Sequence, residues 1–443
     1  MPCECFLAET SLARAGWGKS PCPVRRGRGA RADTDNCGRF NSISARLSTL
    51  LVHNFLNSRF KTQNSKLERL VAALLDWFAT NARDLPWRRT RDPYAVWVSE
   101  IMLQQTQVKT VIPYWERWMR ELPTLAAAAQ ASPAKLHKLW EGLGYYTRVR
   151  NLQRAAQQVV VQHDGRFPED FDAILALPGI GRYTAGAICS IAFNQPKPIL
   201  DGNVIRVLTR VFGITADPRE KKTNTRLWQL AEGLILHASH ITHHASPCSH
   251  LNQSLMELGA LICTPRSPNC AACSVNRLCI ARRQGLQEQL PKLAKPIKPT
   301  SRRFLAFIVE RNGKLLVRQR PAGVVNAHLW EFPNVEVGAA TGRARHSVRA
   351  AAPQSTNGAR RTDAPYQQSD FLLSATRPVC VIKHSITRYR ITLEAWRAQL
   401  ADSSTGITGH WLTPNQLHRL AFTSAHKRIL DAVSANASLR KRS

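Results

Sequence analysis

The sequence has 443 residues, and its 62 lysines and arginines against 30 aspartates and glutamates give a formal net charge of +32. This length predicts two or three domains, and the basic charge predicts a polyanionic partner. Nucleic acid is favoured over a membrane because no run approaches the roughly twenty apolar residues that span a bilayer, and 11 cysteines without regular pairing indicate a reducing compartment without disulfides.

Residues 1–65 are expected to form a basic, disordered extension. They are rich in arginine, glycine and serine and poor in apolar residues at regular spacing. Their one apolar run, at residues 48–57, lies too far along the chain and is too polar for a secretory signal. Ordered structure is therefore expected from residue 66.

Residues 66–284 are predicted to form an all-α domain. Its first helix is indicated by apolar residues that recur at helical spacing, namely Leu67, Leu70, Val71, Leu74, Leu75 and Phe78. Asp92 before Pro93 predicts the start of a second helix, because an acidic cap precedes proline at the first helical position. That helix would carry YAVWVSEIMLQQTQV. Further helical patterns run through 134–140, 148–162 and 182–193 and onward from Val204, whereas strand patterns are scarce.

Glu100 is the only carboxylate in the apolar run YAVWVSEIML. Burial among Trp97, Ile101 and Met102 would raise the pKa of this carboxyl, so that it would keep a proton near neutral pH. A buried carboxyl group destabilises a fold unless it serves a purpose. Glu100 is therefore a candidate proton donor.

The motif LPGIG at residues 177–181 lies between two helical patterns and predicts a tight hairpin. Glycines at Gly179 and Gly181 would let backbone amides approach an anion at the start of the second helix. A plain turn between two helices explains the motif equally well. The net charge favours contact with a DNA phosphate.

Asp201 directly precedes the helical pattern that begins near Val204. An acid at this position is most often only a helix cap. However, two carboxylates in different environments are also what cleavage of a glycosidic bond requires, one to donate a proton and one to stabilise the cationic sugar. Both interpretations of Asp201 stay open at this point.

Cys263, Cys270, Cys273 and Cys279 lie in a polar loop with the spacing Cys-x6-Cys-x2-Cys-x5-Cys. Ordinary buried cysteines would be scattered through helices and strands rather than gathered in one loop. Structural zinc sites usually pair two short Cys-x2-4-Cys motifs, and only one short pair is present here. The spacing over 263–279 therefore favours an iron-sulfur cluster over zinc.

Residues 285–303 are basic and rich in proline, which predicts an extended linker. A small α+β domain is expected over 304–437, with strands FLAFIV, KLLVRQR, VCVIK and YRITLEAW and the helix SAHKRILDAV. The stretch at about 338–370 has almost no large apolar residues and predicts a flexible insert.

Several of these motifs together resemble one family, the adenine DNA glycosylases of the MutY type. They are LPWRR (85–89), WVSEIMLQQTQV (97–108), WEGLGYYTRVRNL (140–152), LPGIGRYTAGA (177–187), LDGNVIRVL (200–208) and the four-cysteine loop. The likeness covers about 66–285. It continues more weakly from 304, where LWEFP, KHSITRYRI and SAHKRIL resemble a MutT-like domain. The implied fold is a helix-hairpin-helix glycosylase domain with an iron-sulfur loop, followed by an α+β MutT-like (Nudix-like) recognition domain.

The resemblance implies a monomeric enzyme of base excision repair that removes adenine mispaired with 8-oxoguanine or guanine in double-stranded DNA. It implies one four-iron four-sulfur (4Fe-4S) cluster and no nucleotide cofactor. Glu100 would protonate adenine at N7, Asp201 would stabilise the cationic sugar, and Tyr183 and Asn203 would orient the carboxylates. Relatives that resemble endonuclease III have a lysine at the position of Tyr183, which forms a Schiff base and nicks the strand. Tyrosine therefore implies a monofunctional glycosylase.

The resemblance also assigns residues that contact DNA. Leu103, Gln105 and Tyr145 would intrude near the mispair, although core packing is the alternative for Leu103 and Tyr145. Arg83, Arg88 and Gln253 would line the adenine pocket, and Gly179, Gly181 and Arg266 would face phosphates. Where the family reads 8-oxoguanine with Phe-Ser-His, this chain has Ile386-Thr387-Arg388, and only Thr387 keeps the hydroxyl.

The C-terminal domain lacks the run of glutamates that binds Mg²⁺ in nucleotide pyrophosphatases, so it is expected to recognise rather than hydrolyse. Two other functions stay open: a bifunctional pyrimidine glycosylase with lyase activity, and a non-catalytic DNA-binding protein whose cysteines hold zinc. The expected location is the bacterial cytoplasm at the nucleoid, or the nucleus or mitochondrion in a eukaryote.

Overall fold

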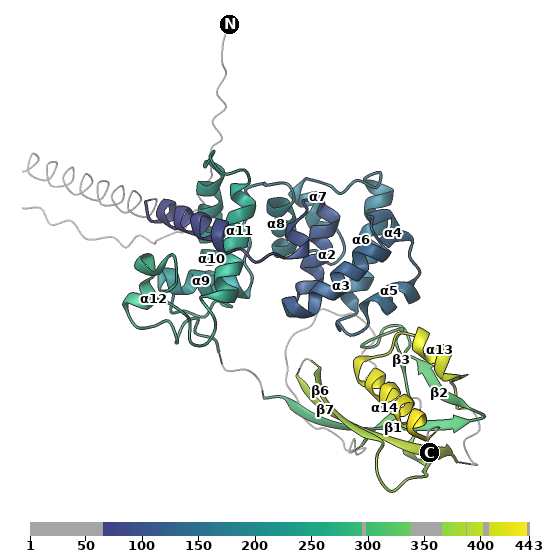
Figure 1. Cartoon of the computed structure of the whole chain (residues 1–443). Coiled ribbons are helices and arrows are strands. Elements are labelled where there is room, and N and C mark those ends of the chain that lie inside the picture. Colours follow the sequence, from purple (N-terminus) through teal and green to yellow (C-terminus); the bar gives the residue numbers. More distant parts are fainter. Residues whose placement is uncertain (1–64, 295–297, 338–365, 387, 402–406, 441–443) are drawn as a thin grey trace, which may run out of the picture. The chain divides into compact units, whose positions relative to one another are not determined.

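The structure is a computed structural model that describes residues 65–294, 298–337, 366–386, 388–401 and 407–440 (Figure 1). Residues 1–64 of the predicted extension therefore lie outside the described residues. So do residues 295–297 of the linker, residues 338–365 of the insert, and Thr387. In the described part of the chain, no helix is long and apolar enough to cross a lipid bilayer.

The N-terminal part of the described chain is helical, as predicted. Residues 65–81 form the first helix. The next helices are η1 (Pro86–Arg88), α2 (Pro93–Leu103), α3 (Val108–Glu121), α4 (Leu125–Gln130), α5 (Pro133–Trp140), α6 (Thr147–Gln162), α7 (Phe171–Leu175) and α8 (Arg182–Ile191). They are followed by α9 (Gly202–Phe212), α10 (Lys221–Ser239), α11 (Pro247–Leu261), η2 (Asn276–Leu278) and α12 (Ile280–Arg283). Among the described residues, the first strand begins only at Thr300.

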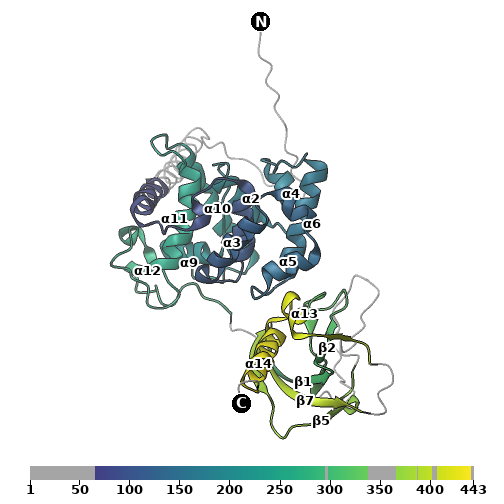
Figure 2. The same cartoon turned by 45° about the vertical axis from the view of Figure 1, so that its right-hand side comes forward.

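Two hydrophobic cores organise these helices. Helices α2 to α6 surround the first core, and Figure 2 shows α4, α5 and α6 together on one side of it. The second core contains residues of the 65–81 helix and of α9, α10 and α11. Helix α8 belongs to both, because Ala185 and Ile188 pack in the first core and Ala187 packs in the second. Side chains of α2, α8 and α9 can therefore meet where the two cores adjoin.

The limits of α2 were predicted correctly at its start and wrongly at its end. The Asp92 carboxylate accepts hydrogen bonds from the amides of Tyr94 and Ala95, as expected of a helix cap. The helix ends at Leu103, five residues before the end of the predicted segment at 108. Beyond it the backbone turns, and Gln105 has a positive φ of 56°. The turn residues Gln104 to Gln107 include neither glycine nor proline, so the sequence did not mark the end of the helix.

The C-terminal part of the described chain is an α+β domain, as predicted. Its strands are β1 (Thr300–Arg311), β2 (Lys314–Gln319), β3 (Trp330–Glu331), β4 (Asn334–Val337), β5 (Phe371–Leu373), β6 (Cys380–Ile386), β7 (Tyr389–Leu400) and β8 (His410–Leu412). Its helices are η3 (Gln368–Asp370), α13 (Pro414–Arg419) and α14 (Ser424–Arg440). The four predicted strands correspond to β1, β2, β6 and β7, and the predicted KLLVRQR and VCVIK each extend one residue beyond the observed strand. The other strands are too short to show alternation.

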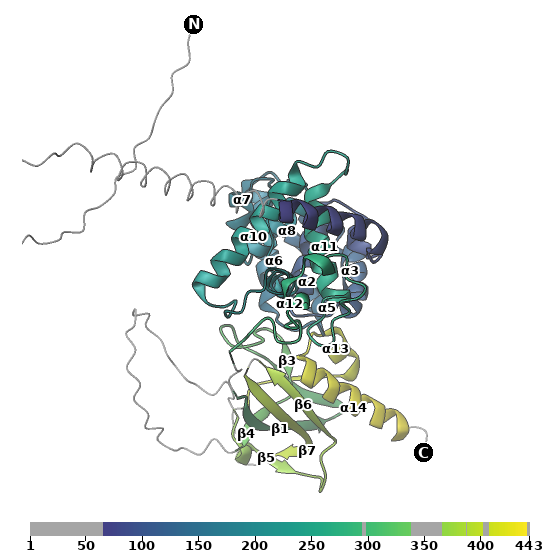
Figure 3. The same ribbon diagram turned by 90° about the vertical axis from the view of Figure 1, so that its left-hand side faces the viewer.

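These eight strands form one mixed sheet, with β3-β2-β1-β7-β5 as its central order. The two longest strands, β1 and β7, pair in parallel from Thr300 opposite Tyr389 to Val309 opposite Ala398. All other pairs are antiparallel. Helix α14 packs on β6 and β3 (Figure 3). Its Ile429 and Leu430 are buried in a core with residues of β1, β2, β6 and β7.

Candidate active site

Glu100 and Tyr183 meet where α2 packs on α8. Glu100 is only 6% exposed. The Tyr183 hydroxyl, on the first turn of α8, donates a hydrogen bond of 2.8 Å to Glu100 Oε2. Burial raises the pKa of Glu100 to about 7, against the opposing effect of this hydrogen bond. Glu100 therefore has the protonation behaviour that the apolar run predicted.

Asp201 caps the N-terminus of α9. Its Oδ1 accepts a hydrogen bond of 2.7 Å from the Val204 amide, and its Oδ2 accepts one of 3.0 Å from Asn203 Nδ2. Burial raises the pKa of Asp201, although these hydrogen bonds favour the charged form and oppose the rise. The charge of Asp201 also contributes to the raised pKa of Glu100. Asp201 is therefore a cap, and it also lies within electrostatic reach of the buried glutamate.

Asn203 connects this site to the cysteine loop through Arg206, which the sequence interpretation missed. The Arg206 guanidinium donates to Asn203 Oδ1 at 2.8 Å and to the Cys263 carbonyl at 2.7 Å. Gly259 lets α11 approach α9 closely at this link, because a Cβ at this position would lie 2.6 Å from Asn203 Cβ. Arg206 follows Asn203 by one helical turn, and this spacing was the available signal.

Two of the three residues predicted for the adenine pocket, Arg83 and Arg88, bind Glu257, a second residue that was missed. Arg83 Nε lies 2.7 Å from Glu257 Oε1, and Arg88 Nη2 lies 2.9 Å from Oε2. Burial would raise the pKa of Glu257, but the two arginines outweigh it and hold this pKa at about 2. Gln253 lies one helical turn earlier on α11, and its Nε2 donates to Ser249 Oγ at 3.1 Å. Glu257 is therefore a buried anion that fixes both guanidinium groups.

Two turns carry the residues expected to intrude into DNA. The first follows α2 and holds Gln105, with Leu103 at the end of the helix packed partly against the first core. The second precedes α6 and holds Tyr145, which is 51% exposed and has a φ of 48°. Core packing is therefore wrong for Tyr145, whereas it describes part of the Leu103 side chain.

The predicted hairpin lies between α7 and α8. Gly179 has a φ of 80°, and a Cβ added there would lie 2.6 Å from Asn151 Cβ, so glycine is needed. Gly181 caps α8 with a φ of −102°, and a Cβ added there would meet no atom within 4 Å. The two glycines therefore have different structural reasons to be present.

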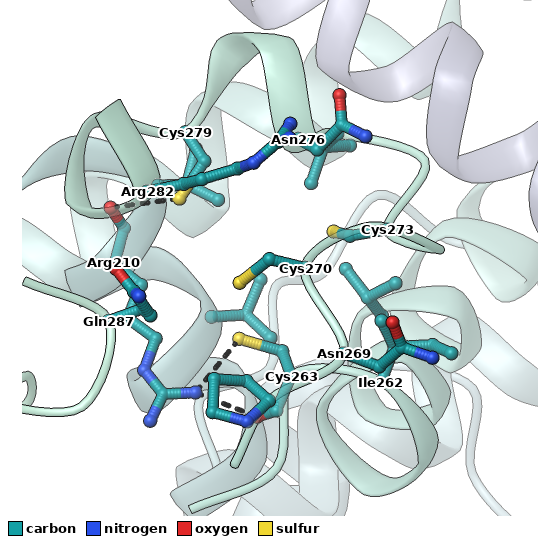
Figure 4. A pocket seen from close by; sticks show the side chains of 15 residues that line it. Arg210, Ile262, Cys263, Asn269, Cys270, Cys273, Asn276, Cys279, Arg282 and Gln287 are labelled. Atoms are coloured by element: carbon teal, nitrogen blue, oxygen red, sulfur yellow. Dashed lines mark hydrogen bonds between the residues drawn. The ribbon is translucent and has the colours of Figure 1, made fainter. Parts of the chain in front are cut away.

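Cys263, Cys270, Cys273 and Cys279 line one pocket (Figure 4). Within the described part of the chain, no group of three His, Cys, Asp or Glu residues is arranged to hold a single metal ion. Arg210, 1% exposed, also lines this pocket. It bonds to the Cys263 sulfur at 3.3 Å and otherwise to carbonyl oxygens, and no carboxylate among the described residues pairs with it.

A buried arginine without a carboxylate partner is costly unless another negative charge compensates it. A group held by four thiolates would supply such a charge. Arg266 is exposed on the same loop, as expected for a residue that faces phosphate. Thr387 lies outside the described residues.

Residues 98–232 match the family model of HhH-GPD superfamily base excision DNA repair proteins, and residues 305–432 match the NUDIX domain. The chain is 35% identical to the adenine DNA glycosylase of Homo sapiens over 81% of this chain and 72% of the human protein. It is 36% identical to that of Rattus norvegicus over 80% of this chain and 76% of the rat protein. A solved thermostable thymine-DNA glycosylase is 31% identical, with a TM-score of 0.45, over 50% of this chain and 99% of its own.

Proposed function

The chain belongs to the family of adenine DNA glycosylases, hydrolases of base excision repair that act on N-glycosidic bonds, and we propose that it removes adenine mispaired with 8-oxoguanine or guanine. The observation that carries this proposal is the pair of differently placed carboxylates. Glu100 is buried with a pKa of about 7, and Asp201 accepts two hydrogen bonds that favour its charged form. Cleavage of a glycosidic bond needs one proton donor and one anion.

In the proposed reaction, Glu100 donates its proton to N7 of an adenine that has left the DNA stack. The bond between C1′ and N9 then breaks, and its electron pair leaves with the base. Asp201 faces the cationic sugar and stabilises its charge. Water adds to C1′ and loses a proton to Glu100, which restores the enzyme and leaves an abasic site.

We also propose that the reaction stops at the abasic site. A lyase needs an amine that attacks C1′ and forms a Schiff base. At the corresponding position this chain has Tyr183, whose half-buried phenol donates to Glu100 and has a pKa raised well above its ordinary value. A neutral phenol cannot form a Schiff base, which disfavours the bifunctional alternative.

For adenine recognition, we propose that Gln253, Arg83 and Arg88 line the pocket that receives the flipped base. The Glu257 carboxylate supports this assignment, because it holds both guanidinium groups at α11, one helical turn beyond Gln253. Fixed donors recognise a base at a lower cost in conformational entropy than mobile ones. Glu257 would therefore act on recognition through the two arginines.

We propose that the four cysteines hold a 4Fe-4S cluster. The pocket they share, their spacing with only one short Cys-x2-Cys pair and the uncompensated Arg210 support a cluster over one zinc ion. When bound, the cluster would add no chemistry to the hydrolysis and would hold the loop 263–279 that carries Arg266. Zinc in the purified protein, without iron, would favour the non-catalytic alternative.

The C-terminal domain is proposed to read 8-oxoguanine without hydrolysing nucleotides. The segment after β6 is the candidate reader, as in the family resemblance. Arg388 is exposed and its guanidinium lies 5.2 Å from the centre of the Tyr389 ring. Because Ile386 and Arg388 replace an aromatic residue and a histidine, we expect a weaker preference for 8-oxoguanine over guanine than Phe-Ser-His gives.

The function is tested with duplexes that carry one adenine opposite 8-oxoguanine, guanine, cytosine or thymine. After incubation, the strand should break at adenine opposite 8-oxoguanine and guanine only when alkali is added, because alkali cleaves abasic sites. Glu100→Gln should lower the excision rate by about 10²- to 10⁴-fold. Glu116→Gln, an exposed carboxylate of α3, is the matched control and should leave the rate unchanged. Intact adenine strands, or full activity of Glu100→Gln, would contradict the proposal.

A further inference from the structure

One arginine joins the two turns that are expected to intrude into DNA. Arg148, on the first turn of α6, sends its two terminal nitrogens to different turns. Nη1 donates to the carbonyls of Ile101 at 2.8 Å, Met102 at 3.0 Å and Gln104 at 2.6 Å. Nη2 donates to the carbonyls of Leu143 at 3.1 Å and Gly144 at 3.2 Å and to Thr106 Oγ1 at 3.5 Å.

These contacts are specific to a guanidinium. Its planar fork directs two nitrogens to separate acceptors at fixed angles, which a lysine ammonium cannot do. No carboxylate among the described residues pairs with Arg148, so backbone carbonyl dipoles, including those at the C-terminus of α2, offset its charge. The rings of Trp140 and Tyr145 lie on it, with centroids 5.4 and 5.6 Å from Cζ.

Both turns have backbones that need outside support. Gln105 and Tyr145 have positive φ angles of 56° and 48°, which are unfavourable for residues other than glycine. The second turn also contains Gly142 and Gly144 at φ of 106° and 71°. Strained single residues keep such conformations only when surrounding contacts fix them. Arg148 provides contacts to both turns at once.

We propose that Arg148 is a positioning residue that fixes the distance between the two turns, so that Gln105 and Tyr145 enter the duplex at the mispair together. This inference rests on the proposed function. It adds that mispair recognition depends on one rigid two-turn unit rather than on two independent loops. Arg148 itself need not touch the DNA.

The test compares Arg148→Met and Arg148→Lys with Arg219→Met, a control that removes an exposed arginine of the same domain. Both Arg148 variants should lose about ten- to a hundredfold in single-turnover excision opposite 8-oxoguanine. They should also bind the mispaired duplex correspondingly more weakly, while binding to a matched duplex changes less than about twofold. Equal losses on both duplexes would show that Arg148 binds phosphate, and full activity of Arg148→Lys would exclude the fork; either result overturns the proposal.

A double-mutant cycle separates positioning from general damage to the fold. In a background with Gln105→Ala and Tyr145→Ala, Arg148→Met should cost less than about threefold, since residues that act through one another are not additive. The same loss in both backgrounds would overturn the proposal. Should Arg148→Met fail to fold, Arg148→Lys carries this cycle.

Hydrogen exchange of the DNA-free protein provides a measurement that does not depend on activity. Amides of residues 103–106 and 142–146 should exchange faster in the Arg148 variants than in Arg219→Met, with the remaining helices unchanged. If the unmodified protein leaves adenine intact, the proposed function fails, and this comparison alone decides whether Arg148 fixes the two turns. Unchanged exchange in both turns would overturn it.

Discussion

The proton on Glu100 sets the pH range in which the protein should act. Because its pKa is about 7, the excision rate should fall as pH rises through this value and the donor loses its proton. The hydrogen bond from Tyr183 lowers this pKa. In Tyr183→Phe, the alkaline limb of the pH-rate profile should therefore shift to higher pH by about one pH unit. Single-turnover excision from pH 5 to 10 measures this shift.

The Tyr183→Phe variant keeps the aromatic ring and loses only the donor, so its fold should be preserved. A limb that stays in place would show that Glu100 is not the titrating acid. A shift of the limb to lower pH would show that the hydroxyl does not stabilise the charged form of Glu100.

Asp201→Asn tests whether the cap is also the anion of the reaction. Asparagine caps a helix as well as aspartate does, so α9 and the thermal midpoint should change little. The excision rate should nevertheless fall by at least about 10²- to 10³-fold, because the charge acts on the cationic transition state. Affinity for the mispaired duplex should be nearly unchanged, as measured by fluorescence anisotropy. A parallel loss of affinity and rate would instead assign Asp201 to binding.

The sequence singled out Glu100 and Asp201 because each stands out locally, one as a lone acid in an apolar run and the other before a helix. Glu257 is also the only carboxylate of its helix, between Met256 and Leu258, so the same local signal was present and was missed. Its partners carry no such signal, because Arg83 is 174 residues away and the fold alone brings the two together. Long-range pairs of this kind cannot be inferred from one sequence.

At the scale of elements, the helical hairpin could be predicted because glycine marks a turn between two periodic segments. The end of α2 could not, since Arg148 satisfies the final carbonyls from another helix and no glycine or proline follows Leu103 in the turn. When a side chain from another helix caps a helix end, the sequence around that end does not show it.

The hairpin allows a matched pair of substitutions. Gly179→Ala would place a Cβ 2.6 Å from Asn151 Cβ at a φ of 80°, so it should destabilise the fold by about 1–3 kcal/mol. Gly181→Ala meets no neighbour within 4 Å and should cost less than about 1 kcal/mol as a changed helix cap. Urea denaturation of both variants measures the difference. Equal stabilities would show that the hairpin shifts to accept the methyl group.

At the scale of the molecule, the sequence predicted an all-α domain followed by an α+β domain. It did not predict how the strands of the second domain pair. Its two long strands pair in parallel from Thr300 opposite Tyr389, across a stretch of chain that carries no marker of register. The alternation in YRITLEAW shows which residues share a face, but it leaves open which strand lies beside it. Four of the eight strands are also too short to be recognised by periodicity.

The four-cysteine loop leads to a prediction about the whole molecule. Protein purified without oxygen should contain about four irons per chain and show the brown absorbance of an iron-sulfur cluster.

Removal of iron by oxidation and chelation would leave Arg210 buried among carbonyls with no compensating charge, so the loop 263–279 should unfold locally. Through Arg206, this would also release Asn203 and disturb Asp201. DNA affinity and excision should therefore be lost together, while far-ultraviolet circular dichroism of the remaining helices changes little. Full excision by iron-free protein would show that the loop is held by its own contacts.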